Sequence, residues 1–184
     1  LRHMLATGLA HEDGPSSIRY PRGSGLGVPL EGDPVALPLG TSETLAEGED
    51  LCILAVGSMV AAALGARDIL AKAGLTAEVI DMRFIKPLDE ELLVSVWRRH
   101  RMVVTVEENS LAGGFGSAVL EWGAQPGVAE RPQVVNLGIP DAFQEHASRD
   151  ELLTDMGLTA EGIARSVQEH LESRRGGPRA QSAS

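Results

Sequence analysis

From Leu51 onward, apolar runs of strand length alternate with segments of helical periodicity. The continuous apolar run at 51–56 is typical of a strand that is covered on both faces. Apolar residues then recur at steps of three and four between positions 59 and 73, which predicts a helix with one apolar face. Further strands are predicted at 77–82, 102–106 and 133–137, and further helices at 88–96, after the turn at 113–116, from the capping box at 148–151, and around 163–171. This alternation predicts an α/β fold with a mostly parallel sheet flanked by helices.

Four zones follow from the same pattern. Residues 1–27 hold a short predicted helix at 4–10 and a short strand-like run at 17–20, and they are too few to fold alone. Residues 28–49 carry three prolines and scattered glycines, which predicts a linker that contributes an edge strand near 35–39. The α/β domain is expected at 50–172. The tail at 173–184 is expected to be disordered, because it has nothing to bury.

The charge balance excludes some classes of partner. The chain has 16 Lys and Arg residues against 26 Asp and Glu residues, which gives a net charge of −10. Such a chain repels nucleic acid and acidic membrane surfaces, so neither is an expected partner. No run approaches the roughly 20 apolar residues of a membrane span. The single cysteine, Cys52, cannot form an internal disulfide and suits a reducing cytoplasm, and a start at Leu1 indicates a piece of a longer polypeptide.

Two glycine-containing turns follow predicted strands, where doubly wound folds bind phosphates. A dinucleotide-binding turn needs several glycines, and Gly57 is the only glycine of the first turn. A dinucleotide site there, with the Asp81 carboxylate binding the ribose, is therefore the less favoured interpretation. The turn at 113–116 contains three glycines, but Val119 stands where a third motif glycine would be needed. Close packing is therefore the preferred interpretation of this turn.

Glu107 and Glu108 fall at the carboxyl end of a predicted strand, the edge where open α/β sheets bind ligands. Successive residues leaving a strand point in opposite directions, so one glutamate is expected to pair with a cation or to cap backbone amides. Acid–base catalysis by either glutamate remains the less favoured alternative. No two of the five histidines have metal-site spacing on a helix, and no metal site is expected in the chain. His146 is expected to pack in its loop, with contact to another domain or subunit as the alternative.

Arg22 is the most interesting cation, because it stands between Pro21 and a glycine-rich stretch that would let a ligand approach. A guanidinium can bind a phosphate through two hydrogen bonds, so Arg22 is a candidate phosphate ligand. Most arginines lie on the surface, however, and without further information a surface arginine is the favoured interpretation of Arg22. Arg19 would share its face and is expected to form a structural ion pair.

Several motifs in series resemble the C-terminal part of the 1-deoxy-D-xylulose-5-phosphate synthase family. The resemblance covers about residues 1–172, and a series of blocks is more specific than any single motif. It implies that residues 1–27 end the central, pyrimidine-binding domain and that residues 50–172 form a transketolase-like C-terminal domain. The blocks lie at 18–23 (IRYPRG), 79–91 (VIDMRFIKPLDEE), 105–109 (TVEEN), 113–118 (GGFGSA) and 137–141 (LGIPD).

The resemblance also implies a function. The family uses thiamine diphosphate and magnesium to decarboxylate pyruvate and add the two-carbon unit to glyceraldehyde 3-phosphate, the first step of a route to isoprenoids, thiamine and pyridoxal. It is generally dimeric, so a homodimer is expected. Arg22 then matches the arginine that binds the phosphate of the aldehyde substrate. The family's cofactor and metal ligands lie upstream, since the 32–34 stretch is not the Gly-Asp-Gly motif, and we expect no catalytic residue and no turnover from this chain alone.

Two alternatives stay open at this stage. The chain could be part of another transketolase-like enzyme, such as the β part of a 2-oxo acid dehydrogenase. It could also be a freestanding, non-catalytic module for subunit contact or ligand sensing, a reading weakened by the N-terminal zone that lacks a core of its own.

Overall fold

A five-stranded sheet lies at the centre of the chain, whose computed structural model describes residues 1–21, 23, 25, 27, 29–30, 32–128 and 131–175. The strand order is β1-β3-β2-β4-β5, and β2 to β5 run parallel while β1 pairs antiparallel with β3. The predicted α/β class is confirmed. The strands are β1 (Glu43–Ala46), β2 (Leu51–Ala55), β3 (Ala77–Asp81), β4 (Met102–Ser110) and β5 (Gln133–Ile139).

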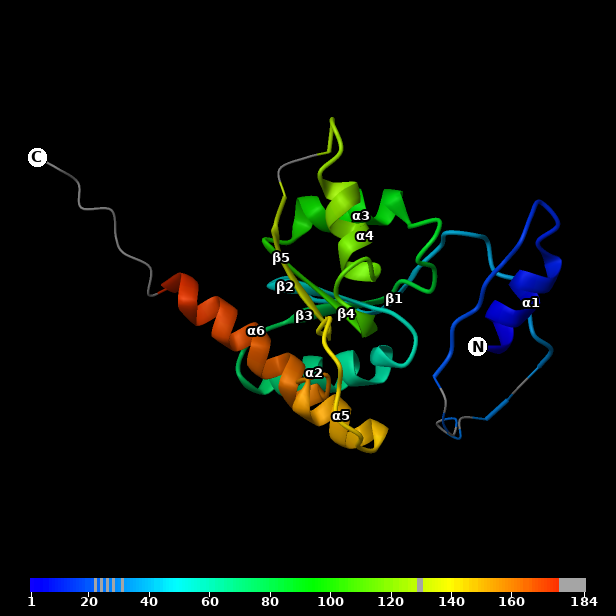
Figure 1. Ribbon diagram of the computed structural model, residues 1–184. Coiled ribbons are helices and arrows are strands. Elements are labelled where there is room, and N and C mark those ends of the chain that lie inside the picture. The colour runs from blue at the N-terminus through cyan, green and yellow to red at the C-terminus, as the bar shows by residue number, and fades with distance from the viewer. Residues whose placement is uncertain are drawn as a thin grey trace, which may run out of the picture.

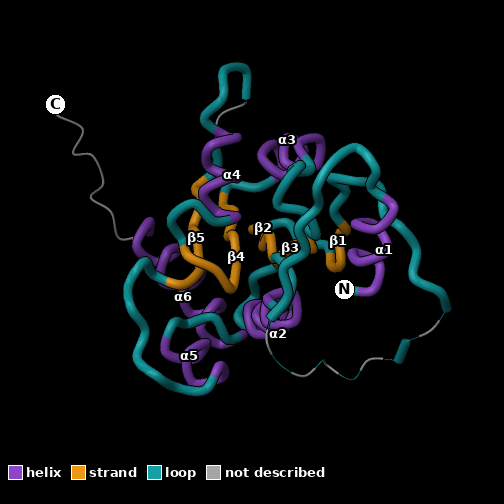
Figure 2. Tube along the Cα trace, turned by 45° about the vertical axis from the view of Figure 1, so that its right-hand side comes forward, coloured by secondary structure: helices purple, strands orange, loops and turns teal. Residues whose placement is uncertain are grey.

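Helices cover both faces of the sheet (Figures 1 and 2). One face packs against α3 and α4, and the opposite face packs against α2 and α6, with α5 beside them. The helices are α1 (Arg2–Ala10), α2 (Met59–Lys72), α3 (Glu90–Arg99), α4 (Phe115–Gly123), α5 (Arg149–Asp155) and α6 (Ala160–Arg175).

The position of β2 at the centre of the sheet explains why its sequence is apolar throughout. Leu51, Ile53 and Ala55 point into the core under α2 and α6, whereas Cys52 and Leu54 point into the core under α3 and α4. All five side chains are fully buried. A strand with alternating polar residues would place charge in one of these two cores, so the continuous apolar run is what a doubly covered strand requires.

The chain reverses its direction across the sheet between β2 and β4. From β2 it proceeds to β3 on one side, and from β4 it proceeds to β5 on the other side. The neighbouring carboxyl ends of β2 and β4 therefore form the topological switch point, where open α/β sheets characteristically bind ligands.

Several predicted boundaries differ from the observed ones. The run at 17–20 forms no strand, because no described segment supplies a ladder for it. The edge strand is β1, which pairs with β3. It lies within the predicted linker, but it follows the 35–39 stretch where we expected it. Helix α3 begins at Glu90 because the Asp89 side chain accepts from the amide of Leu92, so the proline at 87 lies before the helix.

The C-terminal helix is longer than its sequence pattern indicates. Helix α6 continues through Arg175, so residues 173–175 are helical where we expected disorder. The rest of the predicted tail, 176–184, lies outside the described residues.

Helix α1 lies beside the sheet domain, on the side away from the C-terminus (Figure 1). Side chains of α1 hydrogen-bond to the backbone of the segment that leads to β1: Thr7 Oγ1 accepts from the amide of Leu37 at 2.8 Å, and His3 Nδ1 accepts from the amide of Val35 at 2.9 Å. Thr7 is the only buried residue of α1. Hydrogen bonds rather than apolar packing therefore fix this helix to the following segment.

Candidate functional site

The switch point holds a hydrogen-bonded network of side chains from three elements. Ser58, in the turn after β2, donates its hydroxyl to Glu108 Oε2 at 2.5 Å, and Glu108 lies near the end of β4. Ser58 stands at the N-cap position of α2, but its side chain makes no capping hydrogen bond. The hydroxyl therefore ties the ends of two neighbouring strands together instead of capping the helix.

Arg149, the first residue of α5, completes this network. Its Nε and Nη2 atoms donate to Glu108 Oε1 and Oε2, each at 2.6 Å, which is the two-point geometry in which a guanidinium matches a carboxylate. The hydrogen bonds from Arg149, supported by the one from Ser58, lower the pKa of Glu108, and the carboxylate in turn raises the pKa of Arg149. Glu108 is thus held in its charged form at the switch point.

Glu107, one residue earlier, faces the opposite way and is 1% exposed. Its Oε2 accepts from the amide of Phe115 at 2.7 Å and its Oε1 from the amide of Gly116 at 2.8 Å, so the carboxylate caps the N-terminus of α4. The prediction that one glutamate pairs with a cation or caps backbone amides is confirmed, and the structure shows both roles, one on each glutamate. Because amides occupy both oxygens of Glu107, its geometry fits a structural role better than proton transfer.

The glycines around the α4 N-terminus are needed for close approach. A Cβ added to Gly116 would lie 2.6 Å from both Asn136 Cγ and Thr105 Oγ1, and one added to Gly114 would collide with the Glu107 carboxylate. The close-packing interpretation of the 113–116 turn is therefore confirmed, and protein atoms fill the space that a phosphate would need.

A second charged cluster lies at the carboxyl end of β3. Asp81 is half-buried and accepts from the amide of Arg83 at 3.0 Å, while the Arg83 guanidinium forms an ion pair with Glu43 of β1. Burial raises the pKa of Asp81 despite this hydrogen bond and the nearby guanidinium. Arg83 is the only non-glycine residue with positive φ (+53°) in the described part of the chain, so the turn it forms stores backbone strain.

His146 is exposed and lies beside a shallow hollow of about 560 Å³ on the outer side of α5. Asp150 and Asp155 line the same hollow. In the same loop Phe143 is fully exposed. His146 therefore makes no buried loop packing in this chain, and its contact with another domain or subunit stays a prediction.

Arg22, the predicted phosphate ligand, lies outside the described residues. Its neighbour Arg19 is exposed, and the Arg19 charge makes a small contribution to the lowered pKa of Glu108.

The sequence pointed to both glutamates, but it did not indicate that Ser58 and Arg149 are the partners of Glu108. Ser58 directly follows a predicted strand, and this position could have pointed to a role at the sheet edge. It indicates contact with Glu108 only once β2 and β4 are known to be neighbours. Arg149 was noted only as part of the capping box, which is present: Ser148 accepts from the amide of Glu151, and the Glu151 side chain accepts from the amide of Ser148.

The described residues do not fit a magnesium diphosphate site. Such a site needs several oxygen ligands, and the one group of potential metal ligands in the described part of the chain combines Cys52, Glu78 and His100. Asp33, in the stretch compared above with the family's metal motif, is exposed. The switch-point network itself joins β2, β4 and α5 through charged hydrogen bonds and is suited to hold this edge rigid. Among the described residues, no helix is both long and apolar enough to cross a membrane.

Residues 40–163 match the family described as "Transketolase, C-terminal domain". The chain is 52% identical over 164 residues to a protein of Thermomicrobium roseum named 1-deoxy-D-xylulose-5-phosphate synthase, covering 89% of this chain and 26% of that protein. It is 47% identical over 174 residues to 1-deoxy-D-xylulose-5-phosphate synthase 1 of Geobacter sulfurreducens, covering 95% of this chain and 27% of the relative. The chain thus spans about a quarter of the length of these curated relatives.

Solved structures show the same fold. A structure described as a split-gene transketolase, inactive beta4 tetramer, aligns with a TM-score of 0.66 and 41% identity, covering 78% of this chain and 45% of its own. A transketolase of Pichia stipitis aligns with a TM-score of 0.53 at 22% identity over 74% of this chain and 19% of its own, which supports the fold alone.

Proposed function

The chain belongs to the transketolase C-terminal domain family, and we propose that it forms the C-terminal part of a 1-deoxy-D-xylulose-5-phosphate synthase. The observation that carries this proposal is the name shared by the relatives, together with their high identity over nearly the whole chain. The motif series at 18–23 and 79–91 supports the same conclusion.

The proposed reaction joins pyruvate and glyceraldehyde 3-phosphate, with loss of CO₂, to give 1-deoxy-D-xylulose 5-phosphate, a precursor of isoprenoids, thiamine and pyridoxal. Thiamine diphosphate, bound with magnesium, would make the carbanion equivalent of the two-carbon unit. Since the described residues do not fit that cofactor, its ligands belong to other parts of the enzyme, and the isolated chain is proposed to be inactive. A homodimer is part of the proposal. So is a cytoplasmic location, which agrees with the single cysteine.

Within this enzyme, Arg22 is proposed to bind the phosphate of the aldehyde substrate. A guanidinium can hold a phosphate through two hydrogen bonds, and that binding energy can orient the distant aldehyde carbon for attack. The Ser58–Glu108–Arg149 network would support this function by keeping the carboxyl edge of the sheet rigid.

A chimera tests the proposal. The C-terminal quarter of the Thermomicrobium roseum relative is replaced by this chain, and product formation is measured with pyruvate, glyceraldehyde 3-phosphate, thiamine diphosphate and magnesium. We expect turnover from the chimera, and none from the truncated relative or from this chain alone. A chimera that folds and binds the cofactor but forms no product would favour the non-catalytic module instead.

A further inference from the structure

The loop that joins β5 to α5, at 140–148, presents an aromatic ring to solvent. Phe143 lies in this loop and is 108% exposed, more than any other large apolar residue in the described part of the chain. Every residue of the loop except Ala147 is exposed. A fully exposed phenylalanine leaves its whole apolar surface in water, and aromatic residues of this kind are enriched at protein interfaces.

The loop is fixed at both of its ends. The carbonyl of Ile139, just before the loop, accepts from the amide of Leu111 at 2.9 Å. Arg149, just after the loop, binds Glu108 through two hydrogen bonds. A ring carried by a loop that is already held in place loses less conformational freedom on binding, which favours a specific contact.

The exposed apolar residues of the sheet domain gather at the carboxyl edge of the sheet. Phe143 follows β5 and the partly exposed Ile85 follows β3, so both lie at the edge that holds the switch-point network. The third such residue, Leu45, belongs to the edge strand β1. Among the described residues, the loops at the amino edge expose no large apolar side chain. The carboxyl edge is therefore the face of this domain that is best suited to an apolar contact.

Exposed acidic side chains accompany the ring. Asp141 and Glu145 lie in the loop on either side of Phe143, and Asp150 and Asp155 lie on α5. Both aspartates of α5 line the shallow hollow of about 560 Å³ beside the loop. A complementary partner therefore has an apolar pocket for the ring and lysine or arginine side chains around that pocket.

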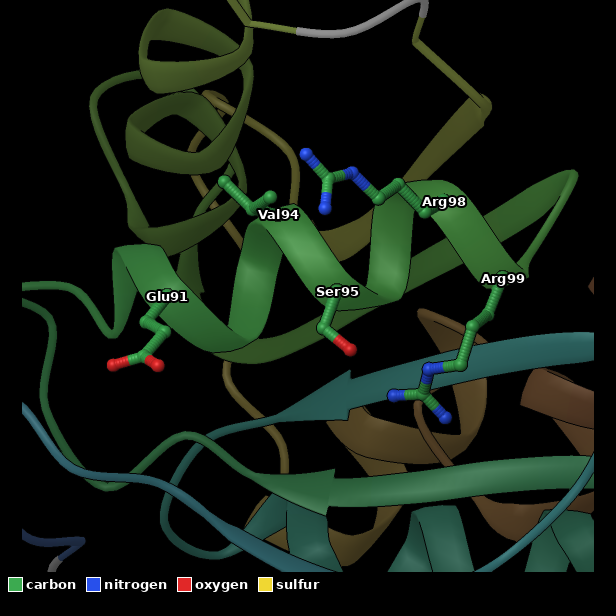
Figure 3. Close-up of a pocket in the computed structure, with 5 residues that line it drawn as sticks. All are labelled: Glu91, Val94, Ser95, Arg98 and Arg99. Carbon is green, nitrogen blue, oxygen red and sulfur yellow. The ribbon is translucent and has the colours of Figure 1, made fainter.

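A second copy of this chain does not fit this face. A two-fold contact would bring the acids of the two loops together, and like charges would repel. The hollow of about 460 Å³ on the outer face of α3 carries Arg98 and Arg99 (Figure 3), but Arg99 also binds the buried Glu78. A loop seated in the α3 hollow of another copy would form a head-to-tail contact, which gives rings or open chains instead of a two-fold dimer.

We propose that the 140–148 loop docks this domain on the part of the synthase outside this chain, with Phe143 filling an apolar pocket that basic side chains surround. This inference rests on the proposed function, which supplies the partner. The chain spans about a quarter of the length of its curated relatives, so most of the proposed enzyme lies outside it and is tethered to this domain at high effective concentration. Docking there places the switch-point network beside a domain interface.

Thiol labelling tests the docking without relying on activity. Gln144→Cys places a thiol next to Phe143, while the natural Cys52 is fully buried. The substitution is made in the 184-residue chain and in the chimera with the Thermomicrobium roseum relative, and mass spectrometry locates the label. We expect labelling to be slower in the chimera by roughly tenfold or more. Ser95→Cys, on the exposed outer face of α3 (Figure 3), is the matched control and should react equally in both proteins.

Phe143→Ser tests the ring itself. It should leave urea denaturation of the isolated chain unchanged, because the ring is exposed there, and should raise the labelling of Gln144→Cys in the chimera toward the rate in the isolated chain. Equal labelling of Gln144→Cys in both proteins would overturn the proposal. Slow labelling in the isolated chain would also overturn it if Phe143→Ser dissociated a dimer, since a second copy would then cover this face.

The same measurements separate this inference from the proposed function. An active chimera with an unprotected loop would refute the docking and leave the proposed function intact. A folded chimera that protects the loop but forms no product would do the reverse.

Discussion

Glu107 and Glu108 are consecutive residues of β4 whose carboxylates bind different helices on opposite sides of the strand. Glu107 caps the N-terminus of α4, and Glu108 holds the first residue of α5. Two adjacent acids thus connect a single strand to both helical layers of the domain.

Replacing Glu107 should be strongly destabilising, because it would leave two buried α4 amides without an acceptor. We expect Glu107→Ala to lower the free energy of unfolding by about 2–4 kcal/mol, and Glu107→Gln to cost less, since an amide oxygen still accepts one hydrogen bond. Urea denaturation measures both effects. Glu121→Gln, at an exposed position of α4, is the control and should have almost no effect. Equal stability of Glu107→Ala and the parent chain would contradict the capping role.

The Glu108–Arg149 pair should make stability depend on pH. The pKa of Glu108 is lowered in the folded chain, so the stabilisation is fully present above the ordinary value of 4.5 and is lost as the pH falls through the lowered pKa. Arg149→Ala should cost about 1 kcal/mol at neutral pH, and the difference from the parent chain should vanish in acid. Denaturation curves across this range provide the measurement.

The control for this pair is Arg67→Ala, which removes a half-buried arginine whose ion pair, within the described part of the chain, is with its sequence neighbour Asp68. It should leave stability nearly unchanged at every pH. A difference between Arg149→Ala and the parent chain that persisted undiminished in strong acid would mean that packing, not charge, carries the effect.

Gly116 should tolerate no side chain. A methyl group there would meet Asn136 and Thr105 at 2.6 Å, and both are held by the Thr105–Asn136 hydrogen bond. We expect Gly116→Ala to lower the free energy of unfolding by about 1–3 kcal/mol. Gly25→Ala is the matched control, because no atom of the described residues lies within 4 Å of its added methyl group. Thermal melts of the two variants should differ clearly, and similar melting temperatures would show that the turn can relax.

Arg22 should affect one substrate only. In the active chimera, Arg22→Ala should raise the KM for glyceraldehyde 3-phosphate by well over tenfold, the loss of about 1.5–3 kcal/mol from a charged hydrogen bond, and leave the KM for pyruvate nearly unchanged. Steady-state kinetics with each substrate varied in turn will show this. Arg67→Ala serves as the control, and an unchanged KM for the aldehyde would remove Arg22 from the binding site.

The sequence predicted most of the domain because its two signals, continuous apolar strands and helices with one apolar face, are local. Strand β2 and helix α2 fall within a residue or two of their expected bounds. The edge strand was misplaced because its position depends on pairing with β3 and not on its own sequence. The run at 17–20 has strand-like alternation but no described neighbour to pair with.

The candidate site was predictable only in part, for the same reason. Glu107 and Glu108 were found because opposite orientation is a property of any strand. The side-chain partners of Glu108, however, are distant in the sequence: Ser58 lies 50 positions away and Arg149 lies 41 positions away. Such contacts need the order of strands in the sheet, and the buried group around Cys52 required the register between two of them as well.

Helix α1 buries only Thr7, and side-chain hydrogen bonds attach it to the segment before β1. An element with so little apolar burial can open without disturbing the sheet. Its amide protons should therefore exchange with heavy water through a local opening, long before those of β2. A protease that samples such openings would cut the chain first near α1 and leave the sheet domain whole.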